Sequence, residues 1–245
     1  MARLEKQASF ISQTTFPLLD FAPGHRVLDL ATGVAAMATR LLKRFPGISL
    51  VGVDLSRTQL GAARSHHPEV TVLRGDATRL PFADETFDRV HCSWLLEHVP
   101  DPVAVLRDVR RVLKPGGSCH FIEVDNSSFG MTPHSAAVTE VLGMLNDAQL
   151  RGGGDPFIGK RAETLFREAG FERAKFERPL LRGAEENASF RQQFIDEFSE
   201  IFEGLDESLG AEKVPLIARA AAELRALPSV KGSLWYTPAI VTAWR

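Results

Sequence analysis

The fold is decided by the stretch Val27-Leu28-Asp29-Leu30-Ala31-Thr32-Gly33-Val34-Ala35 and, further along, by Val51-Gly52-Val53-Asp54-Leu55-Ser56. The first is an apolar run that enters a turn of small residues, and the second is an apolar run that ends on a carboxylate. A helical pattern separates them. In an α/β sheet this strand, turn, helix and strand, with an acidic residue about twenty positions after the turn, is typical of a nucleoside-binding crevice. The sequence therefore predicts a nucleoside cofactor.

Strand-like and helix-like segments alternate along the rest of the chain. Helical patterns separate most of the apolar runs, and such alternation indicates parallel strands joined by right-handed crossovers. The predicted fold is α/β, a doubly wound, Rossmann-like, seven-stranded and mostly parallel sheet. The apolar runs predict strands near 26–30, 49–54, 70–74, 87–93, 118–125, 172–179 and 233–244.

The length of 245 residues suits one domain with additions. The core is predicted at about 21–182 and 233–245. Residues 1–20 are expected to form an N-terminal helical cover over the crevice, and about 183–232 a C-terminal helical lid inserted before the last strand.

The predicted lid carries an aromatic stripe and an acidic face. The stripe either packs the lid onto the sheet or, with Trp94 and Trp235, lines an apolar substrate pocket. The acidic face is expected to be solvated, and it would also suit a cationic substrate. Four phenylalanines at steps of four make the stripe: Phe190, Phe194, Phe198 and Phe202.

Composition excludes several classes of protein. The 29 Lys and Arg residues nearly balance the 31 Asp and Glu residues, which disfavours a nucleic-acid partner. The cysteines Cys92 and Cys119 lie in apolar segments, so we expect no disulfide framework and a reducing compartment. We find neither a signal peptide nor an apolar run of membrane-spanning length. The expected protein is cytoplasmic and acts on a small-molecule partner, and a homodimer is compatible with the sequence.

The turn after the first strand resembles that of class I S-adenosylmethionine-dependent methyltransferases, in the small-molecule branch around the ubiquinone and menaquinone C-methyltransferases. The family pattern is a strand, an acidic residue and then Gly-x-Gly-x-Gly. Here Asp29 is followed by Ala31, Gly33 and Ala35, so both outer glycines are alanines. The resemblance covers about residues 25–125 and continues more loosely through the turn 155–159.

The resemblance implies a role for each turn of the crevice. Asp29, Ala31, Thr32 and Gly33 would surround S-adenosylmethionine at the first turn, and Asp54 would accept hydrogen bonds from both ribose hydroxyls.

Three further contacts to this cofactor follow from the same resemblance. Leu55 would pack on the adenine, while Asp76 and the Ala77 backbone N–H would bind its edge. Ser93 and Trp94, which end the fourth strand, would meet the methionine portion. Each aspartate, taken singly, could instead cap a helix.

Candidate catalytic and substrate-binding residues follow the fourth and fifth strands. His98 can accept a proton near neutral pH, or it can be a structural residue before the next helix. Glu123, Asp125 and Asn126 leave the fifth strand at its carboxyl end, where they touch substrate or cap the following segment. We assign Phe194, Phe198 and Trp235 to the substrate pocket as well. No cluster has metal-ligand spacing, so no metal is expected.

The predicted function is S-adenosylmethionine-dependent methyl transfer to a carbon, oxygen or nitrogen of a partly apolar metabolite, such as one of secondary metabolism. The first alternative is a methyltransferase-like protein that uses the cofactor for another reaction or as a scaffold, which the altered turn favours. The second is a nicotinamide-dependent oxidoreductase. It is weakened because the only tyrosine, Tyr236, has no lysine four residues later.

Overall fold

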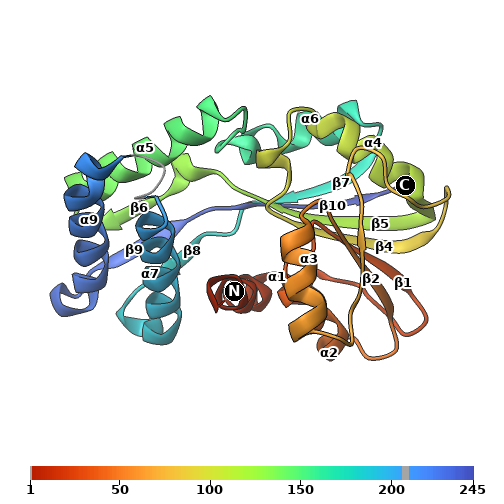
Figure 1. The fold of residues 1–245 in the computed structure, drawn as a ribbon, viewed down its shortest axis with the longest axis horizontal. Helices are drawn as coiled ribbons and strands as arrows, with labels where there is room; N and C mark the ends of the chain where they lie inside the picture. The colour runs from red at the N-terminus through yellow and green to blue at the C-terminus, as the bar shows by residue number, and fades with distance from the viewer. Residues whose placement is uncertain (1, 206–209) are drawn as a thin grey trace.

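The computed structural model describes residues 2–205 and 210–245, and within them the large sheet has seven strands in the order β3-β2-β1-β4-β5-β10-β7 (Figure 1). Neighbouring strands from β3 to β5 pair in parallel, whereas β10 is antiparallel to both β5 and β7. The predicted seven-stranded, mostly parallel α/β sheet is confirmed. Its strands are β1 (Arg26–Leu30), β2 (Ser49–Asp54), β3 (Thr71–Arg74), β4 (Phe87–Ser93), β5 (Leu113–Glu123), β7 (Arg173–Glu177) and β10 (Ala239–Trp244).

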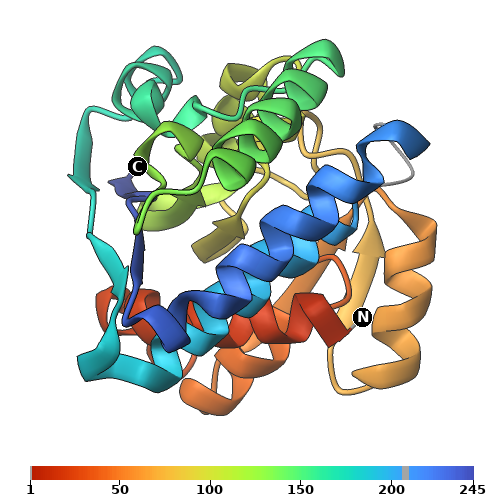
Figure 2. The same ribbon diagram turned by 90° about the vertical axis from the view of Figure 1, so that its left-hand side faces the viewer.

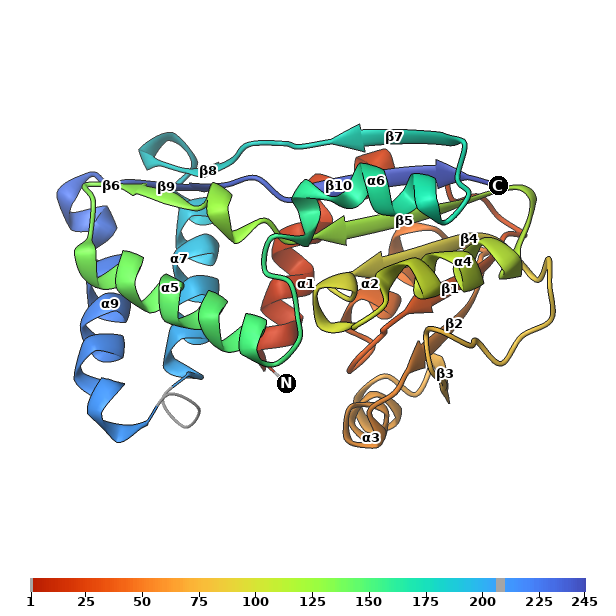
Figure 3. The same ribbon diagram turned by 90° about the horizontal axis from the view of Figure 1, so that it is seen from above.

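Helices cover both faces of this sheet. In Figures 1 and 3, α4 and α6 lie on one face, and α2 and α3 lie on the other. Adjacent residues of β1 serve the two sides, because Val27 packs in the core with α2 while Leu28 packs in the core with α4. The helices are α2 (Ala36–Arg44), α3 (Arg57–His66), α4 (Pro102–Val112) and α6 (Ala162–Glu168).

The strand order reverses between β1 and β4. From β1 the chain moves outward to β2 and β3, and it then returns to place β4 on the other side of β1. Two crossovers leave in opposite directions there, so a crevice opens outside the carboxyl ends of the strands.

A second lobe stands beside the large sheet. In Figure 2, α7 and α9 lie side by side with α1 next to them, and α5 packs on α9. The N-terminal helix α1 packs against both α2 and α7, so it fills the space between sheet and lobe. The lobe comprises a small antiparallel sheet, β6 (Gly130–Thr132), β9 (Ser233–Tyr236) and β8 (Leu181–Gly183), and the helices α5 (Ala136–Arg151), α7 (Ala188–Glu203) and α9 (Val214–Ala226), with α1 at Ala2–Thr15.

The segment 233–244 differs from its prediction as one strand. It forms β9 and β10, which belong to different sheets. Between them lie Thr237 and Pro238, and proline has no N–H for a sheet hydrogen bond. The Thr237 N–H donates instead to the Ser128 hydroxyl at 2.8 Å, so the ladder is interrupted there.

Short 3-10 helices connect many of these elements. In the described part of the chain, every helix is too short or too polar to cross a bilayer. The 3-10 helices are Phe16–Leu18, Leu96–His98, Asn126–Ser128, Ile158–Lys160, Glu185–Asn187, Ala211–Lys213 and Leu227–Val230.

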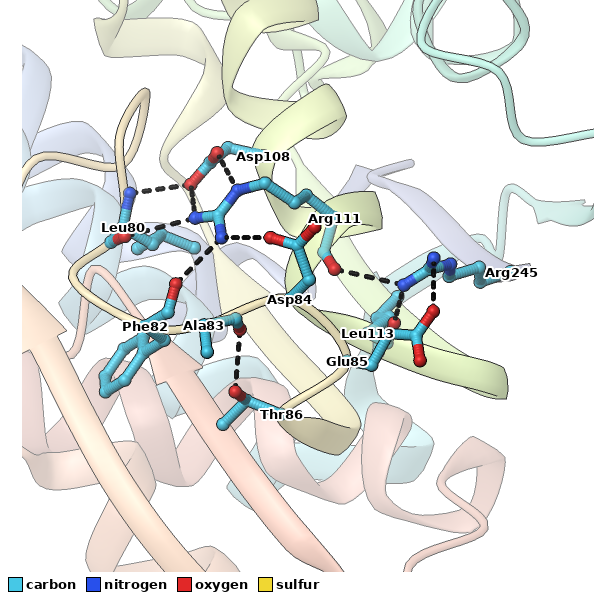
Figure 4. Close-up of polar contacts among 10 residues, drawn as sticks. All are labelled: Leu80, Phe82, Ala83, Asp84, Glu85, Thr86, Asp108, Arg111, Leu113 and Arg245. Atoms are coloured by element: carbon cyan, nitrogen blue, oxygen red, sulfur yellow. Dashed lines mark hydrogen bonds and ion pairs between the residues drawn. The ribbon is translucent and has the colours of Figure 1, made fainter.

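Two arginines form a network of hydrogen bonds and ion pairs at the edge of the large sheet where β4 and β5 begin (Figure 4). Arg111 binds both oxygens of Asp108 at 2.7 and 2.9 Å and donates to the Phe82 carbonyl at 2.7 Å. Arg245 donates to the Arg111 carbonyl at 3.0 Å and to Glu85 at 2.9 Å. We call this set the amino-edge network, since it lies opposite the carboxyl ends of β1 and β4.

Candidate active site

A cavity of about 580 Å³ lies over the carboxyl ends of β1, β2 and β4 and beneath α1 and α7. This volume is within the range of small-molecule sites. Its strand side is lined by the predicted cofactor residues Ala31, Thr32, Gly33, Asp54, Ser93 and Trp94. The opposite side, which we call the lid side, is formed by α1, α5 and α7. It is mainly apolar and is lined by side chains that include Leu4, Ile11, Leu145, Phe194, Phe198 and Ile201.

The turn after β1 keeps a left-handed backbone at all three positions where the family pattern has glycine. The φ angles are 56° at Ala31, 56° at Gly33 and 65° at Ala35. An L-residue in this conformation costs roughly 1 kcal/mol. The two alanines therefore preserve the course of the turn with backbone strain.

Asp29 lies beneath this turn and does not line the cavity. It is 2% exposed, and its carboxylate accepts from the Thr32 hydroxyl at 2.6 Å and contacts His91 Nδ1 at 2.8 Å. Gly52 on β2 makes room for Thr32, because a Cβ there would lie 2.7 Å from its side chain. Asp29 therefore holds Thr32 in place.

Asp54 ends β2 at the cavity wall. Its Oδ2 accepts from the Gly33 N–H at 2.9 Å and its Oδ1 from the Ser56 N–H at 2.8 Å. These bonds fix the carboxylate, and each oxygen keeps a lone pair for another donor.

The residues predicted at the adenine end lie near Asp54 but are not among the residues that line the cavity. The Gly75 N–H donates to the Asp54 carbonyl at 3.1 Å, which joins the ends of β2 and β3. Leu55 is 60% exposed, Asp76 is exposed and Ala77 is half-buried. Hydrogen bonds from the Thr78 N–H and hydroxyl lower the pKa of Asp76.

Trp94, the residue after β4, has a left-handed backbone with φ 55°. This conformation is a clear outlier for a bulky residue. The Trp94 N–H donates to the Ile122 carbonyl at 2.8 Å, which holds the strained residue at the cavity wall. Strain of this kind clusters at functional sites.

His98 lines the cavity with a side chain that is 62% exposed. Its Nε2 lies 3.6 Å from Oε1 of Glu97, a second lining residue that we did not single out from the sequence. Burial raises the pKa of Glu97, whose Oε2 accepts from Gln149 at 2.5 Å. The glycine-rich turn 151–156 passes close to Glu97, because a Cβ on Gly154 would lie 2.5 Å from the Glu97 carbonyl oxygen.

The three candidates after β5 occupy different environments. Glu123 is fully buried, does not line the cavity, and accepts from the Leu95 and Leu96 N–H groups at 3.3 and 3.1 Å. Burial, then the nearby Glu97, raises the pKa of Glu123 to about 8.

Asp125 is also buried, away from the cavity wall. It pairs with Arg178 and accepts from the Ser127 hydroxyl at 2.6 Å. Of the three, only Asn126 lines the cavity, and its amide donates to Asn146 at 2.8 Å. Glu123 and Asp125 therefore act on the loops after β4 and β5 and do not reach the cavity.

The aromatic stripe of α7 lines the cavity in part, as one of the two alternatives predicts. Its remaining rings pack on α1 and within the second lobe, where the other alternative predicts the large sheet. Phe194 and Phe198 line the cavity, whereas Phe190 stacks on Phe10 of α1 with centroids 4.8 Å apart and Phe202 is fully buried.

Trp235 differs from its prediction. It lines a separate cavity of about 240 Å³ with Phe129 and Met131, whereas Tyr236 lines the main cavity. Successive residues of a strand face opposite sides, so β9 presents its two aromatic residues to different cavities.

The acidic face of α7 is not solvated throughout. Glu197 is 7% exposed and lines the main cavity together with Arg3 and Gln7 of α1. The sequence carries a signal for this, because Glu197 follows Phe194 by three positions and precedes Ile201 by four, so all three share one face. Over residues 2–205 and 210–245, no group of three or more His, Cys, Asp or Glu side chains is placed to hold a metal ion.

Comparison with known proteins agrees with this arrangement. Residues 28–121 match the family model described as a methyltransferase domain. A demethylmenaquinone methyltransferase from Mycobacterium sp. (strain KMS) is 42% identical over 126 residues, which cover 50% of this chain and 53% of that protein. The predicted resemblance to class I S-adenosylmethionine-dependent methyltransferases of the menaquinone branch is confirmed. The chain spans about half the length of the curated relatives it matches.

Solved structures share the fold at low identity. One is a Haemonchus contortus phosphoethanolamine N-methyltransferase 2 in complex with S-adenosylhomocysteine, with a TM-score of 0.59 and 19% identity, covering 97% of this chain and 52% of that one. Another is the [4+2]-cyclase SpnF, with a TM-score of 0.57 and 22% identity, covering 98% and 81%. At such identities the matches show the fold alone.

Proposed function

We propose that this protein binds S-adenosylmethionine at the strand side of the main cavity and transfers the methyl group to a partly apolar small molecule on the lid side. The match of residues 28–121 to a methyltransferase domain supports this, as do the names of the relatives. The observation that carries the proposal is a single cavity with one wall of backbone turns and a fixed carboxylate and one wall of apolar side chains.

The strand side fits an adenosine-type cofactor. Asp54 offers a fixed acceptor to a ribose diol, and the Ala31-Thr32-Gly33 turn presents backbone at close range. Leu55, Asp76 and Ala77 would bind adenine at the open end beyond Asp54. Ser93 and Trp94 would hold the methionine portion, and Asp29 would act through Thr32.

The chain has to align the reactants and exclude water. The bound cofactor would supply an activated methyl group. Alignment alone can supply a large rate enhancement, with effective molarities of about 10⁵ M or more. Phe194 and Phe198 would orient the apolar body, with Asn126 at the edge, while α1 and α7 keep water out.

His98 is the candidate general base, because it lines the cavity and Glu97 lies 3.6 Å from its Nε2. We expect His98→Ala to lower methyl transfer strongly and to leave S-adenosylhomocysteine affinity and thermal stability unchanged. If His98→Ala lowers the thermal stability of the protein along with methyl transfer, His98 has a structural role instead.

Two measurements test the proposal. Calorimetry should detect S-adenosylhomocysteine and not NADH, whereas the reverse would favour the oxidoreductase. Transfer of a tritiated methyl group to a panel of apolar alcohols, amines and quinols should then identify an acceptor. Binding without transfer to any acceptor would favour use of the cofactor as a scaffold or in another reaction, a reading that the alanines at positions 31 and 35 still support.

A further inference from the structure

The lid side of the cavity contains one buried carboxylate that protein donors satisfy on one oxygen only. Oε1 of Glu197 accepts from Arg3 at 3.2 Å and from Gln7 at 2.8 Å. Oε2 is buried and has no hydrogen-bond partner within the described ranges. Leaving a buried oxygen without a donor is costly. This atom therefore marks a place where a donor is missing.

The contact between α1 and α7 does not account for the second oxygen. Oε1 alone joins the two helices through Arg3 and Gln7, and Lys6 joins them again through Glu200 at 2.5 Å on the exposed side. An ion pair that only joins the two helices does not require a carboxylate in the cavity wall. Burial at this position raises the pKa of Glu197 to about 7.

The surroundings of Glu197 define the chemistry of a fitting ligand. Neighbouring lining side chains on α1 and α7 are apolar, among them Leu4, Phe198 and Ile201, so the body of the ligand is apolar. The described lining includes the carboxylates Asp54, Glu97 and Glu197 against the guanidinium of Arg3. An anionic ligand would add to this negative charge, whereas a hydroxyl or a protonated amine supplies a donor.

We infer that Glu197 is a specificity-determining residue, whose Oε2 accepts a hydrogen bond from a hydroxyl or protonated amine on an apolar acceptor substrate. The inference rests on the proposed function, because that function makes the lid-side ligand the methyl acceptor.

Four probes of one shape test the inference by calorimetry at about pH 8, where Glu197 is mostly ionised because its pKa is about 7, with and without saturating S-adenosylhomocysteine. They are 2-naphthol, 2-naphthylmethylamine, 2-methylnaphthalene and 2-naphthoate. We expect the first two to bind at least about tenfold more tightly than 2-methylnaphthalene, because a hydrogen bond to a charged group is worth about that much. The naphthoate should bind most weakly. The amine and the naphthol separate a charged donor from a neutral one.

Glu197→Gln should reduce the tenfold preference to about twofold or less, because its amide can keep the bonds to Arg3 and Gln7 while presenting a donor to the ligand. Glu200→Gln is the matched control on the same helix, and it should keep the full preference. Equal binding of 2-naphthol and 2-methylnaphthalene to the unaltered protein would overturn the inference. So would an unchanged preference in Glu197→Gln, or no binding of any probe. Failure of S-adenosylhomocysteine to bind would contradict the proposed function instead, and the probe series without it would still test Glu197.

Discussion

The two edges of the large sheet differ in how far the hydrogen-bonding capacity of their polar groups is satisfied. At the amino edge, the guanidinium of Arg111 is bound by Asp108, Asp84 and two carbonyls, and no side chain in the network has a buried unpartnered polar atom (Figure 4). On the opposite wall of the cavity, Glu197 of α7 keeps a buried oxygen without a partner among the described residues, and so does Glu123 at the carboxyl edge itself. Trp94 and Ala31 also hold left-handed backbones there.

This difference separates stability from function along a single sheet. A saturated network lowers the free energy of the folded state and leaves nothing for a ligand to satisfy. Strained backbone and unpartnered oxygens raise it, and they are the groups that a ligand can stabilise. We therefore expect changes at the amino edge to destabilise the fold, and changes at the carboxyl edge either to weaken binding or, where they relieve strain or the burial of a carboxyl group, to stabilise the fold.

The largest effect is expected at Arg111. Arg111→Met should lower the free energy of unfolding by about 3 kcal/mol, because it leaves Asp108 and two carbonyls without their donor. Denaturant titration measures the loss, and S-adenosylhomocysteine affinity should stay within about twofold. Arg107→Met on the same helix is the control, since Arg107 makes one long contact, 3.4 Å to the Glu168 carbonyl. An Arg111→Met protein that is as stable as the unaltered protein but binds S-adenosylhomocysteine more weakly would contradict this difference between the two edges.

Asp54→Asn should act in the opposite manner. We expect about a 30-fold loss of S-adenosylhomocysteine affinity by calorimetry, because the ribose hydroxyls lose a charged acceptor. Asp88→Asn is the matched control at the amino edge, where Asp88 likewise accepts from a backbone N–H, that of Arg26 at 2.8 Å. It should weaken folding and leave affinity unchanged. Equal affinities in both variants would contradict the proposed role of Asp54.

Glu123 should make stability depend on pH. The folded protein keeps the Glu123 proton up to about pH 8, whereas a free glutamate releases it near 4.5. Between these values the folded state binds more protons, so stability falls as pH rises. Glu123→Gln removes this pH dependence, so we expect its stability relative to the unaltered protein to rise by about 1 kcal/mol for each pH unit between pH 5 and pH 8. Denaturant titrations from pH 5 to 8 measure it, and a constant difference would contradict the assignment.

The smallest effect is expected at Ala31. Ala31→Gly should stabilise the protein by about 0.5 kcal/mol, because glycine adopts φ 56° without strain and this gain exceeds the added entropy of the unfolded chain. Ala62→Gly in the interior of α3 is the control, and it should cost about 1 kcal/mol. Thermal melts of both variants test the pair. Destabilisation by Ala31→Gly would show that the turn is not strained.

The sequence predicts the centre of the large sheet well because consecutive residues of β1 and β4 are buried, which places them on both faces. β1, β2 and β4 are apolar runs that end in turns, and their ends agree with the prediction to the residue. The small sheet has no such signal, since β6 and β8 are three residues long and only partly buried. Pro238 offers a local signal for the break between β9 and β10, but the wider apolar pattern outweighs it.

The candidate site is predictable where the backbone itself makes the contact. The turn 31–33 and Asp54 follow from strand ends, whereas Glu197 depends on which helix covers α7. The position of Glu197 on one helix face with Phe194 and Ile201 indicates that this face is covered, but it does not indicate that α1 covers it. Gln149 is harder still, because it reaches Glu97 from an element 52 residues away.

Trp235 and Tyr236 are consecutive in the chain but belong to separate compartments. A substitution at either position therefore changes the wall of one cavity and leaves the wall of the other cavity unchanged. Insertion or deletion of one residue within β9 would exchange the cavities that the two rings line. We therefore expect ligand preference to evolve by substitution at these positions and rarely by a change in their spacing.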